Sequence, residues 1–388
     1  MHVGFSLLTL LPGKVGGSET YVQGLLGAFG DGEGPERTTV LVTDRVRRTY
    51  EPAVRGAVGL REVPYWRYPQ GTAPRALSIC IGLALGKRLA REASANIDLL
   101  HYPLTVSIPR SPAASVVTYH DAQHLEHPAF FSRPERWYRA LTYDRAARRA
   151  SLVVTPSEFT REIAIDRLGL SPERVRACTS GIDHARFRPD GERDDQILAN
   201  LELPERYLVY PANLWPHKNH GRLLQALGMV RDEELALVLT GGASARMHVL
   251  QTTAERAGIS SRVRHLGYVE DDVLPALYRR AQGMIFPSLY EGFGSPPLEA
   301  MACGCPTAVA RAGALPESCG TATLYFDPAS PESIAEAIDR MAADSALRDG
   351  LREMGIRHAE GFTWAASAHR HTAAYRDAIV MGEPPGAR

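Results

Sequence analysis

Two glutamates separated by seven residues, Glu291 and Glu299, have the spacing in this sequence that most directly suggests chemistry. The run GMIFPS before them predicts a buried strand, and a glycine-rich turn holding Glu291 follows it. Pro296 and Pro297 suit the first turn of a helix, which Gly304 ends. A helix N-terminus binds phosphate through its free N–H groups and partial positive charge. Two carboxylates beside such a site suit hydroxyl groups, as on sugars.

The whole run from residue 286 to 306 resembles the E-G-F-G-x-P-x-L-E-A-M-A-C-G-x-P signature of retaining GT-B glycosyltransferases of sugar-nucleotide family 4. The resemblance implies that Glu291 contacts the donor sugar and that Glu299 contacts the nucleotide ribose. It places Gly294 and Ser295 at the start of the helix, beside the phosphates. Without the resemblance, the same pattern describes a strand–turn–helix unit with solvated glutamates.

A lysine follows a second predicted strand, YLVYPA, in a loop that also holds Asn213, Trp215 and His217. Lys218 at the carboxyl end of a strand suits a diphosphate, to which it offers a compact positive charge; the alternative is a surface lysine. The resembling family usually has an arginine a few residues earlier, where this chain has Asn213. The loop is similar to that of a subgroup with W-x-H-K-N. Either His217 or Arg222 could replace the missing charge, and the sequence leaves the choice open.

Three further segments resemble donor-side parts of the family. Gly241 ends the predicted strand LALVLTGG, and the backbone of Tyr268 and Val269, in the run LGYV, is expected to face the nucleotide base. The segment from Gly313 to Glu317 resembles a donor-side loop. Asp271 and Asp272, which follow LGYV, are expected to cap a helix.

Gly16 and Gly17 stand between the first predicted strand and a helix, for which Ser18 is the expected N-cap. Glycines at such a place let the backbone approach a ligand closely or make a tight turn. Their position resembles the glycine loop of the family, which faces the diphosphate and the acceptor.

His120 ends the predicted strand in VVTYHD, where ligands of doubly wound sheets bind. The segment HDAQHLEHPAFF resembles a family motif whose first histidine faces the donor sugar, and this role falls to His120 alone. Asp121, His124 and His127 could bind zinc with it if all four side chains converged. The plainer reading makes His124 and His127 surface or core histidines.

The aromatic residues Tyr65, Trp66 and Tyr68 flank an arginine in an irregular segment. Such side chains could stack on the sugars of an acceptor or lie at a membrane surface; alternatively, the loop packs on its domain. Residues 137–150 predict an amphipathic helix.

Composition narrows the class of protein. The 388 residues contain 44 basic and 44 acidic side chains, which argues against nucleic-acid binding. Five cysteines without a C-x-x-C pair indicate neither a disulfide framework nor a zinc site, and they fit a reducing compartment. The apolar start lacks the features of a signal peptide, and the apolar run of residues 77–86 is too short to span a bilayer. We expect a cytoplasmic bacterial protein; peripheral membrane contact is compatible with the sequence but is not indicated by it.

Strands alternating with helices predict an α/β fold with parallel doubly wound sheets. The resemblance implies the GT-B fold, with two Rossmann-like domains facing each other across a cleft. We expect an acceptor-side domain at residues 1–190, a nucleotide-sugar domain at 191–365, and a C-terminal helix with its tail at 366–388 that crosses back to the first domain.

The implied activity is transfer of a hexose, with retention, from a UDP- or GDP-sugar to a hydroxyl of a saccharide, lipid-linked or small-molecule acceptor. The chain contains no D-x-D motif, so no metal or other cofactor is expected. A nucleotide-sugar epimerase and a non-catalytic sugar-nucleotide-binding protein are the alternatives. The chain also lacks the G-x-G-x-x-G fingerprint of a dehydrogenase.

Overall fold

The computed structural model describes residues 1–13, 16–51, 54–63, 66, 95–109, 113–242 and 247–382. The chain forms two compact units, one of Met1–Gly181 with Thr363–Arg388 and one of Ile182–Phe362. The unit boundaries thus lie at residues 181 and 362, earlier in the chain than the expected 190 and 365.

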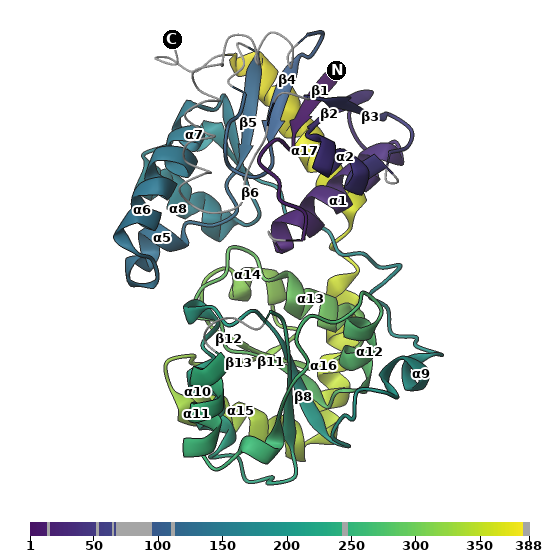
Figure 1. Cartoon of the computed structure of the whole chain (residues 1–388), viewed down its shortest axis with the longest axis vertical. Helices are drawn as coiled ribbons and strands as arrows, with labels where there is room; N and C mark the ends of the chain where they lie inside the picture. Colours follow the sequence, from purple (N-terminus) through teal and green to yellow (C-terminus); the bar gives the residue numbers. More distant parts are fainter. Residues whose placement is uncertain are drawn as a thin grey trace. The chain divides into compact units, whose positions relative to one another are not determined.

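The first unit is built on a seven-stranded parallel sheet with the order β3-β2-β1-β4-β5-β6-β7 (Figure 1). Most of its strands are short, buried runs rich in β-branched residues, which suit a sheet covered on both faces, whereas the edge strands β3 and β7 are only partly buried. They are β1 (His2–Ser6), β2 (Arg37–Val42), β3 (Val58–Glu62), β4 (Leu99–Tyr102), β5 (Ala114–Thr118), β6 (Leu152–Thr155) and β7 (Val175–Ala177).

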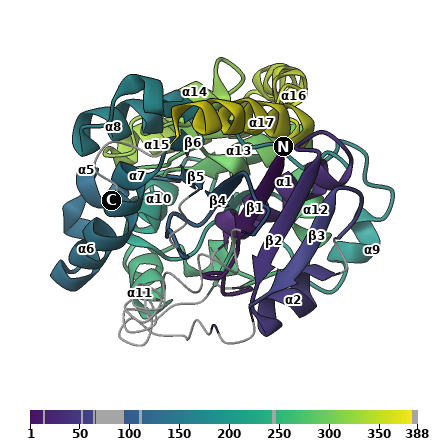
Figure 2. The same ribbon diagram turned by 90° about the horizontal axis from the view of Figure 1, so that it is seen from above.

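Helices cover this sheet, and the last helix of the chain is one of them. In the described part of the unit the α-helices are α1 (Gly17–Gly30), α2 (Asp44–Tyr50), α5 (Gln123–Glu126), α6 (Arg133–Arg139), α7 (Arg145–Arg149), α8 (Glu158–Leu168) and α17 (Trp364–Met381). Helix α17 packs against α1 and strands β4, β5 and β6 (Figure 2). A Cβ atom on Gly24 of α1 would lie 2.0 Å from the Trp364 ring, so this contact requires a glycine.

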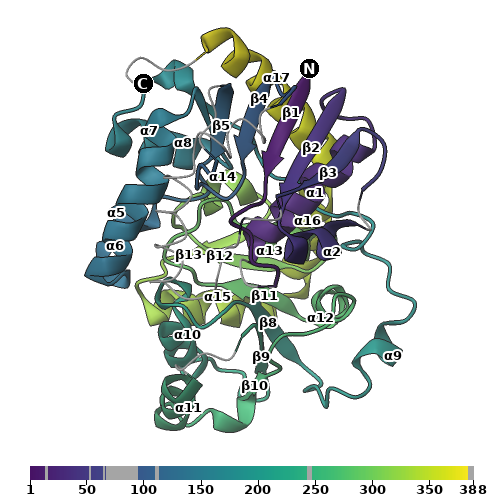
Figure 3. The ribbon, with the colours of Figure 1, turned by 45° about the horizontal axis from the view of Figure 1, so that its top comes forward.

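The second unit has a six-stranded parallel sheet with the order β10-β9-β8-β11-β12-β13 (Figure 3). Its strands are β8 (Tyr207–Pro211), β9 (Ala236–Thr240), β10 (Val263–His265), β11 (Gly283–Phe286), β12 (Thr307–Ala310) and β13 (Leu324–Phe326). Its α-helices are α9 (Asp194–Leu198), α10 (His220–Leu227), α11 (Met247–Arg256), α12 (Val273–Arg280), α13 (Ser295–Ala302), α14 (Leu315–Cys319), α15 (Pro331–Ala343) and α16 (Ser345–Ala359). The predicted α/β class with two doubly wound parallel sheets is therefore confirmed.

The helix caps expected from the sequence differ from those observed. Ser157 caps α8 by accepting a hydrogen bond from the Thr160 amide at 3.1 Å. Ser18 does not cap α1, because the helix already includes Gly17 and its N-cap is Gly16. Asp272 occupies the N-cap position of α12, but its side chain accepts no capping bond.

The polar stretch after residue 189 is no free linker. Its helix α9 packs on α12, where Arg279 donates to both carboxylate oxygens of Asp194 at 2.6 and 2.8 Å. Both side chains are nearly buried. The bidentate pair neutralises the acidic segment and holds it on the second unit.

A chain of hydrogen bonds runs through the core of the first unit and connects α17 to α1, β4 and β5. It joins the Tyr21 hydroxyl to His371 Nε2 (2.7 Å) and Thr118 Oγ1 (3.0 Å), Thr118 Oγ1 to His101 Nε2 (2.7 Å), and His101 Nδ1 to the Tyr375 hydroxyl (2.7 Å). The imidazoles of His101 and His371 are fully buried.

The hydrogen bonds between these side chains are compatible with one arrangement of the protons. His371 Nδ1 lies 2.8 Å from the Ser367 carbonyl, which only accepts, so Nδ1 carries the proton and Nε2 accepts from Tyr21. Tyr21 therefore accepts from Thr118, and Thr118 accepts from His101 Nε2. Both histidines are neutral, and burial lowers the pKa of His371 to about 4 and that of His101 well below its usual value.

These histidines should make the first unit acid-sensitive. Unfolding exposes them with a pKa near 6.5, so below about pH 6.5 the unfolded chain binds protons that the folded chain does not. Stability is complete above this pH and falls toward pH 4, for His371 by up to ~3 kcal/mol. His371→Gln should flatten the decline in melting temperature between pH 7 and pH 5.

His369→Gln is the matched control, because His369 lies on the same helix but is exposed and pairs with Glu33 on the surface. Its pH dependence should follow that of the wild type. An unchanged decline in the His371 variant would show that the buried histidine does not cause the acid sensitivity.

Candidate functional site

The turn between β11 and α13 has the geometry that its sequence predicts. Gly294 is the N-cap of α13 with φ 105°, and a Cβ atom there would lie 2.7 Å from Leu315 Cδ2. Pro296 and Pro297 occupy the first turn, and the helix ends before Gly304, which has φ 71°. The free N–H groups at the start of α13 therefore follow directly on a rigid glycine turn.

Lys218 and Glu291 meet at the edge of this sheet, although they are 73 residues apart. Lys218 Nζ lies 2.5 Å from Glu291 Oε1, and the exposed fractions of the two side chains are 12% and 14%. The ammonium also lies 5.2 Å from the centre of the Phe286 ring. Gly313 packs closely on the Glu291 backbone: a Cβ atom on this residue, with φ 58°, would lie 2.7 Å from that backbone.

Glu299 lies on α13, one turn beyond Ser295. Its carboxylate has no hydrogen-bond partner among the described residues. Burial raises its pKa to about 7, against the opposing effect of the Arg186 charge. Near neutral pH this carboxyl group is therefore divided between its acidic and ionised forms, and hydroxyl donors would favour the ionised form.

Gly241 and Tyr268 form the neighbouring part of the same edge. Gly241 has φ 120°, and a Cβ atom there would lie 2.7 Å from the Ala212 backbone. The Tyr268 side chain is 76% exposed, and its ring covers Gly242 so closely that a Cβ atom there would approach it to 2.8 Å. Val269 packs partly on the core of the unit. An exposed aromatic ring and nearby loop backbone are thus available to a nucleotide base.

Asn213 has a structural contact that its position in the sequence did not reveal. Its Oδ1 accepts a hydrogen bond from the Gly242 amide at 2.7 Å and so ties the loop after β8 to the loop after β9. An arginine at this position could not accept that bond.

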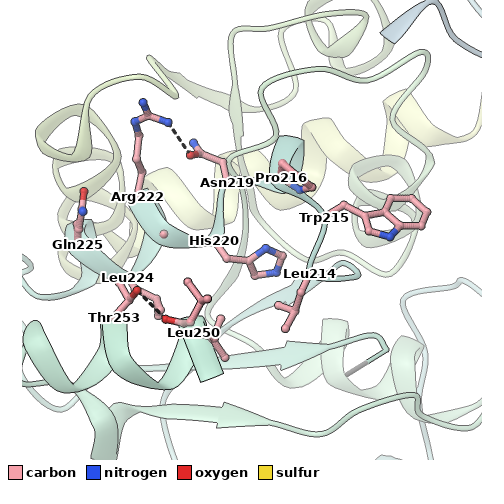
Figure 4. Close-up of a pocket in the computed structure, with 12 residues that line it drawn as sticks. Leu214, Trp215, Pro216, Asn219, His220, Arg222, Leu224, Gln225, Leu250 and Thr253 are labelled. Atoms are coloured by element: carbon pink, nitrogen blue, oxygen red, sulfur yellow. Dashed lines mark hydrogen bonds between the residues drawn. The ribbon is translucent and has the colours of Figure 1, made fainter. Parts of the chain in front are cut away.

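A cavity of about 380 Å³ lies between α10 and α11 (Figure 4). Trp215, His220 and Arg222 are among its lining residues. Arg222 points toward Asn219, with Nη1 3.1 Å from Oδ1, and Asn219 also binds two backbone carbonyls. Burial, followed by the Lys218 charge, lowers the pKa of His220 to about 3. Arg222 therefore reaches the loop of Lys218 through Asn219.

In the first unit, His120 lines a polar cavity of about 220 Å³. Its Nε2 lies 2.6 Å from the Pro103 carbonyl and must donate, which leaves Nδ1 as a free acceptor among the described residues. Burial lowers the pKa of this histidine, so the ring is neutral at physiological pH. A neutral imidazole with an open acceptor suits a hydroxyl group.

The cavity also contains Tyr138, Arg139 and Tyr143, which sequence reasoning did not select, and Asp121, which it considered only as a zinc ligand. Arg139 lies 3.7 Å from Asp121 and stacks over the Tyr143 ring at 5.2 Å. The sequence signal that could have identified Arg139 and Tyr143 is their four-residue spacing after the HD motif. Ser18 also lines this cavity, whereas Gly16 and Gly17 leave open space where their Cβ atoms would be.

The other histidines of the motif have separate partners. His124 is buried and bonds to Asp144 at 3.0 Å, and His127 stacks on Phe130 with ring centres 5.3 Å apart. Within the described parts of the chain, no three His, Cys, Asp or Glu side chains converge as a metal site would require.

The predicted aromatic acceptor site does not hold for Trp66. Its indole is buried, with an exposed fraction of 3%, and its Nε1 donates to the Leu8 carbonyl at 2.9 Å. Burial withdraws this ring from contact with an acceptor, so the alternative of a packed loop is the correct one for Trp66. Tyr65 and Tyr68 lie outside the described residues.

Family models match two long segments of the chain. The model described as "Glycosyltransferase Family 4" matches residues 15–186, and "Glycosyl transferases group 1" matches residues 193–358. The chain is 29% identical to O-antigen chain mannosyltransferase B of Escherichia coli, over 72% of this chain and 74% of that one. It is 32% identical to D-inositol 3-phosphate glycosyltransferase of Salinispora arenicola, over 65% and 60% of the respective chains.

The structure of Anabaena Alr3699/HepE in complex with UDP and glucose has the same fold. The TM-score is 0.73 at 19% identity, with 96% of this chain and 98% of that chain covered. The two sheets are those of the GT-B fold.

Glu299 should make nucleotide binding depend on pH. If its ionised carboxylate accepts hydrogen bonds from ribose hydroxyls, affinity for a nucleoside diphosphate is complete above pH 7 and weakens as pH falls through about 7. Glu299→Gln should bind at least about fivefold more weakly at pH 8, with little further change at pH 6. Calorimetric titration at both pH values measures this.

The same substitution should raise the melting temperature at pH 8, because it removes a buried group that must ionise there. Glu353→Gln is the control, because Glu353 is an exposed acidic residue on α16 of the same unit. A Glu299 variant that binds as tightly as the wild type would remove Glu299 from the nucleotide site.

Proposed function

Because the chain belongs to the group 1 glycosyltransferases of family 4, we propose that it transfers a hexose from a UDP- or GDP-linked donor to a hydroxyl of a saccharide or small natural product. The anomeric configuration is retained. The observation that supports this best is the contact of Lys218 with Glu291 beside the N-terminus of α13.

Each group at this edge has a role in the proposed reaction. The N–H groups at Gly294 and Ser295 and the ammonium of Lys218 bind the diphosphate. A diphosphate competes with Glu291 for Lys218 and so frees the Glu291 carboxylate for the donor sugar. Glu299 binds the ribose, and Tyr268 with Val269 provides the surface for the base.

The charges then assist bond cleavage. As the bond from the anomeric carbon to the phosphate breaks, negative charge grows on the diphosphate and positive charge on the sugar. Lys218 and the N-terminus of α13 stabilise the negative charge on the diphosphate, and Glu291 stabilises the positive charge on the sugar. The acceptor oxygen bonds to the anomeric carbon on the face that the phosphate leaves, and the leaving phosphate accepts the hydroxyl proton. The anomeric configuration is therefore retained. His120 accepts a hydrogen bond from a sugar hydroxyl through Nδ1.

The names of the relatives support mannose and a saccharide acceptor first. The Escherichia coli relative is called an O-antigen chain mannosyltransferase, and the Salinispora relative is called a D-inositol 3-phosphate glycosyltransferase. GDP-mannose is therefore the first donor to test, followed by UDP-hexoses.

The reaction should not require a divalent cation, because Lys218 and the N-terminus of α13 supply positive charge at the diphosphate. Purified enzyme with GDP-mannose or a UDP-hexose and a saccharide acceptor should keep its rate in EDTA. The product's anomeric proton should show the donor's configuration by NMR. Donor alone should yield no isomerised sugar, which separates a transferase from an epimerase.

Two results would contradict this proposal. One is an inverted product. The other is a rate abolished by EDTA and restored by manganese, which would require a metal at the diphosphate.

A further inference from the structure

The segment that follows the HD motif carries an exposed stripe of two apolar and three basic side chains. They are Arg133, Trp137, Leu141, Arg145 and Arg149, spaced four residues apart on α6, the π-helical turn Ala140–Asp144 and α7. All five are exposed, Trp137 by 71% and Leu141 by 46%. Side chains four residues apart are neighbours on a helix surface, so the five form a continuous stripe along the segment.

The opposite face of the segment already has its contacts. Ala146 and Ala147 are buried in the core, and Tyr138, Arg139 and Tyr143 line the cavity of His120. The exposed tryptophan and leucine therefore do not belong to the packing of the first unit. In Figure 3, α6 and α7 lie at the margin of that unit.

The arginines of the stripe have no counter-ion among the residues that the structure describes. Arg133, Arg145 and Arg149 form no ion pair with a described residue, and neither does the neighbouring Arg136. The nearby carboxylates are engaged elsewhere: Glu135 receives two bonds from Ser132, and the buried Asp144 bonds to Tyr119 and His124. The surface is therefore positive, with an apolar centre.

We propose that the Arg133–Arg149 stripe docks the protein on an anionic lipid bilayer. Indole rings favour the headgroup level of a membrane, and arginines with solvated heads bind lipid phosphates. The combination is typical of helices that lie in the plane of the interface. No helix in the described part of the chain is long and apolar enough to cross a membrane.

The position of the stripe relates membrane docking to the proposed reaction. One face of the segment meets the bilayer, while the other face borders the His120 cavity, which lies in the unit that the family resemblance assigns to the acceptor. An acceptor held at the membrane by a lipid would thus reach the cavity past the docked helix. On the basis of the proposed function, we infer a lipid-linked saccharide acceptor.

The test is co-sedimentation of the full chain with vesicles of phosphatidylcholine alone or mixed with phosphatidylglycerol. The wild type should sediment with the anionic vesicles only, and salt should weaken the binding. The triple variant Arg133→Glu, Arg145→Glu and Arg149→Glu should bind at least about tenfold more weakly. Trp137→Ser should reduce binding at every salt concentration.

A matched control changes the same charge elsewhere. Arg256, Arg340 and Arg357 are exposed residues of the second unit without an ion-pair partner among the described residues. The triple variant Arg256→Glu, Arg340→Glu and Arg357→Glu should sediment like the wild type. An equal loss of vesicle binding in both triple variants would show that binding depends on the net charge of the protein and not on this surface, and would overturn the proposal.

The proposal also fails if the wild type does not sediment with anionic vesicles, or if the stripe binds nucleic acid or an acidic protein but no lipid. Nucleoside diphosphate binding by the stripe variants should equal that of the wild type, which shows that they are folded. Vesicle binding without transfer to a lipid-linked saccharide would support the docking surface and reject the acceptor. If the protein proved not to be a glycosyltransferase, the expected vesicle binding would be the same, because it depends on the stripe alone.

Discussion

The ion pair of Lys218 with Glu291 is the contact on which the candidate site depends. Each charge has lost most of its water, so each requires the other, and removal of one partner leaves an uncompensated charge. The pair forms because β8 and β11 are neighbours in a parallel sheet, whose carboxyl ends meet at one edge. Asn219 reinforces it by donating to the carbonyls of Pro287 and Pro328.

The same pair makes the site responsive to an anion. A diphosphate offers Lys218 more negative charge than one carboxylate does, and the N–H groups of α13 add to the attraction. Glu299, with its raised pKa, is likewise poised to gain from hydroxyl donors. Groups that are costly to bury without a partner are thus gathered where a sugar nucleotide would provide one.

Local sequence rules predicted the parts of the site whose geometry is local. The glycine turn, the prolines of α13 and the end of that helix at Gly304 follow from backbone preferences of single residues, and all are observed. The alternation of apolar strands and helices likewise predicted both sheets. The grouping of Glu291, Glu299 and Lys218 at one edge required the family resemblance as well.

What the sequence did not reveal depends on contacts between distant segments. The bond of Asn213 to Gly242, the docking of α9 by Arg279 and the burial of Trp66 all arise from tertiary packing, which overrides local patterns. The chain of bonds from His371 to His101 joins residues 270 positions apart. The exposed stripe was visible only as helical amphipathicity, because burial decides which face the core uses.

The most direct measurement combines binding and kinetics for Lys218→Ala and Glu291→Ala with nucleoside mono- and diphosphate and the sugar donor. Lys218→Ala should lose affinity for the diphosphate but keep that for the monophosphate. Glu291→Ala should bind the diphosphate at least as tightly as the wild type, because Lys218 loses its competing partner, while kcat falls roughly hundredfold. A Glu291→Ala variant with full kcat would contradict the placement of the donor sugar at this edge.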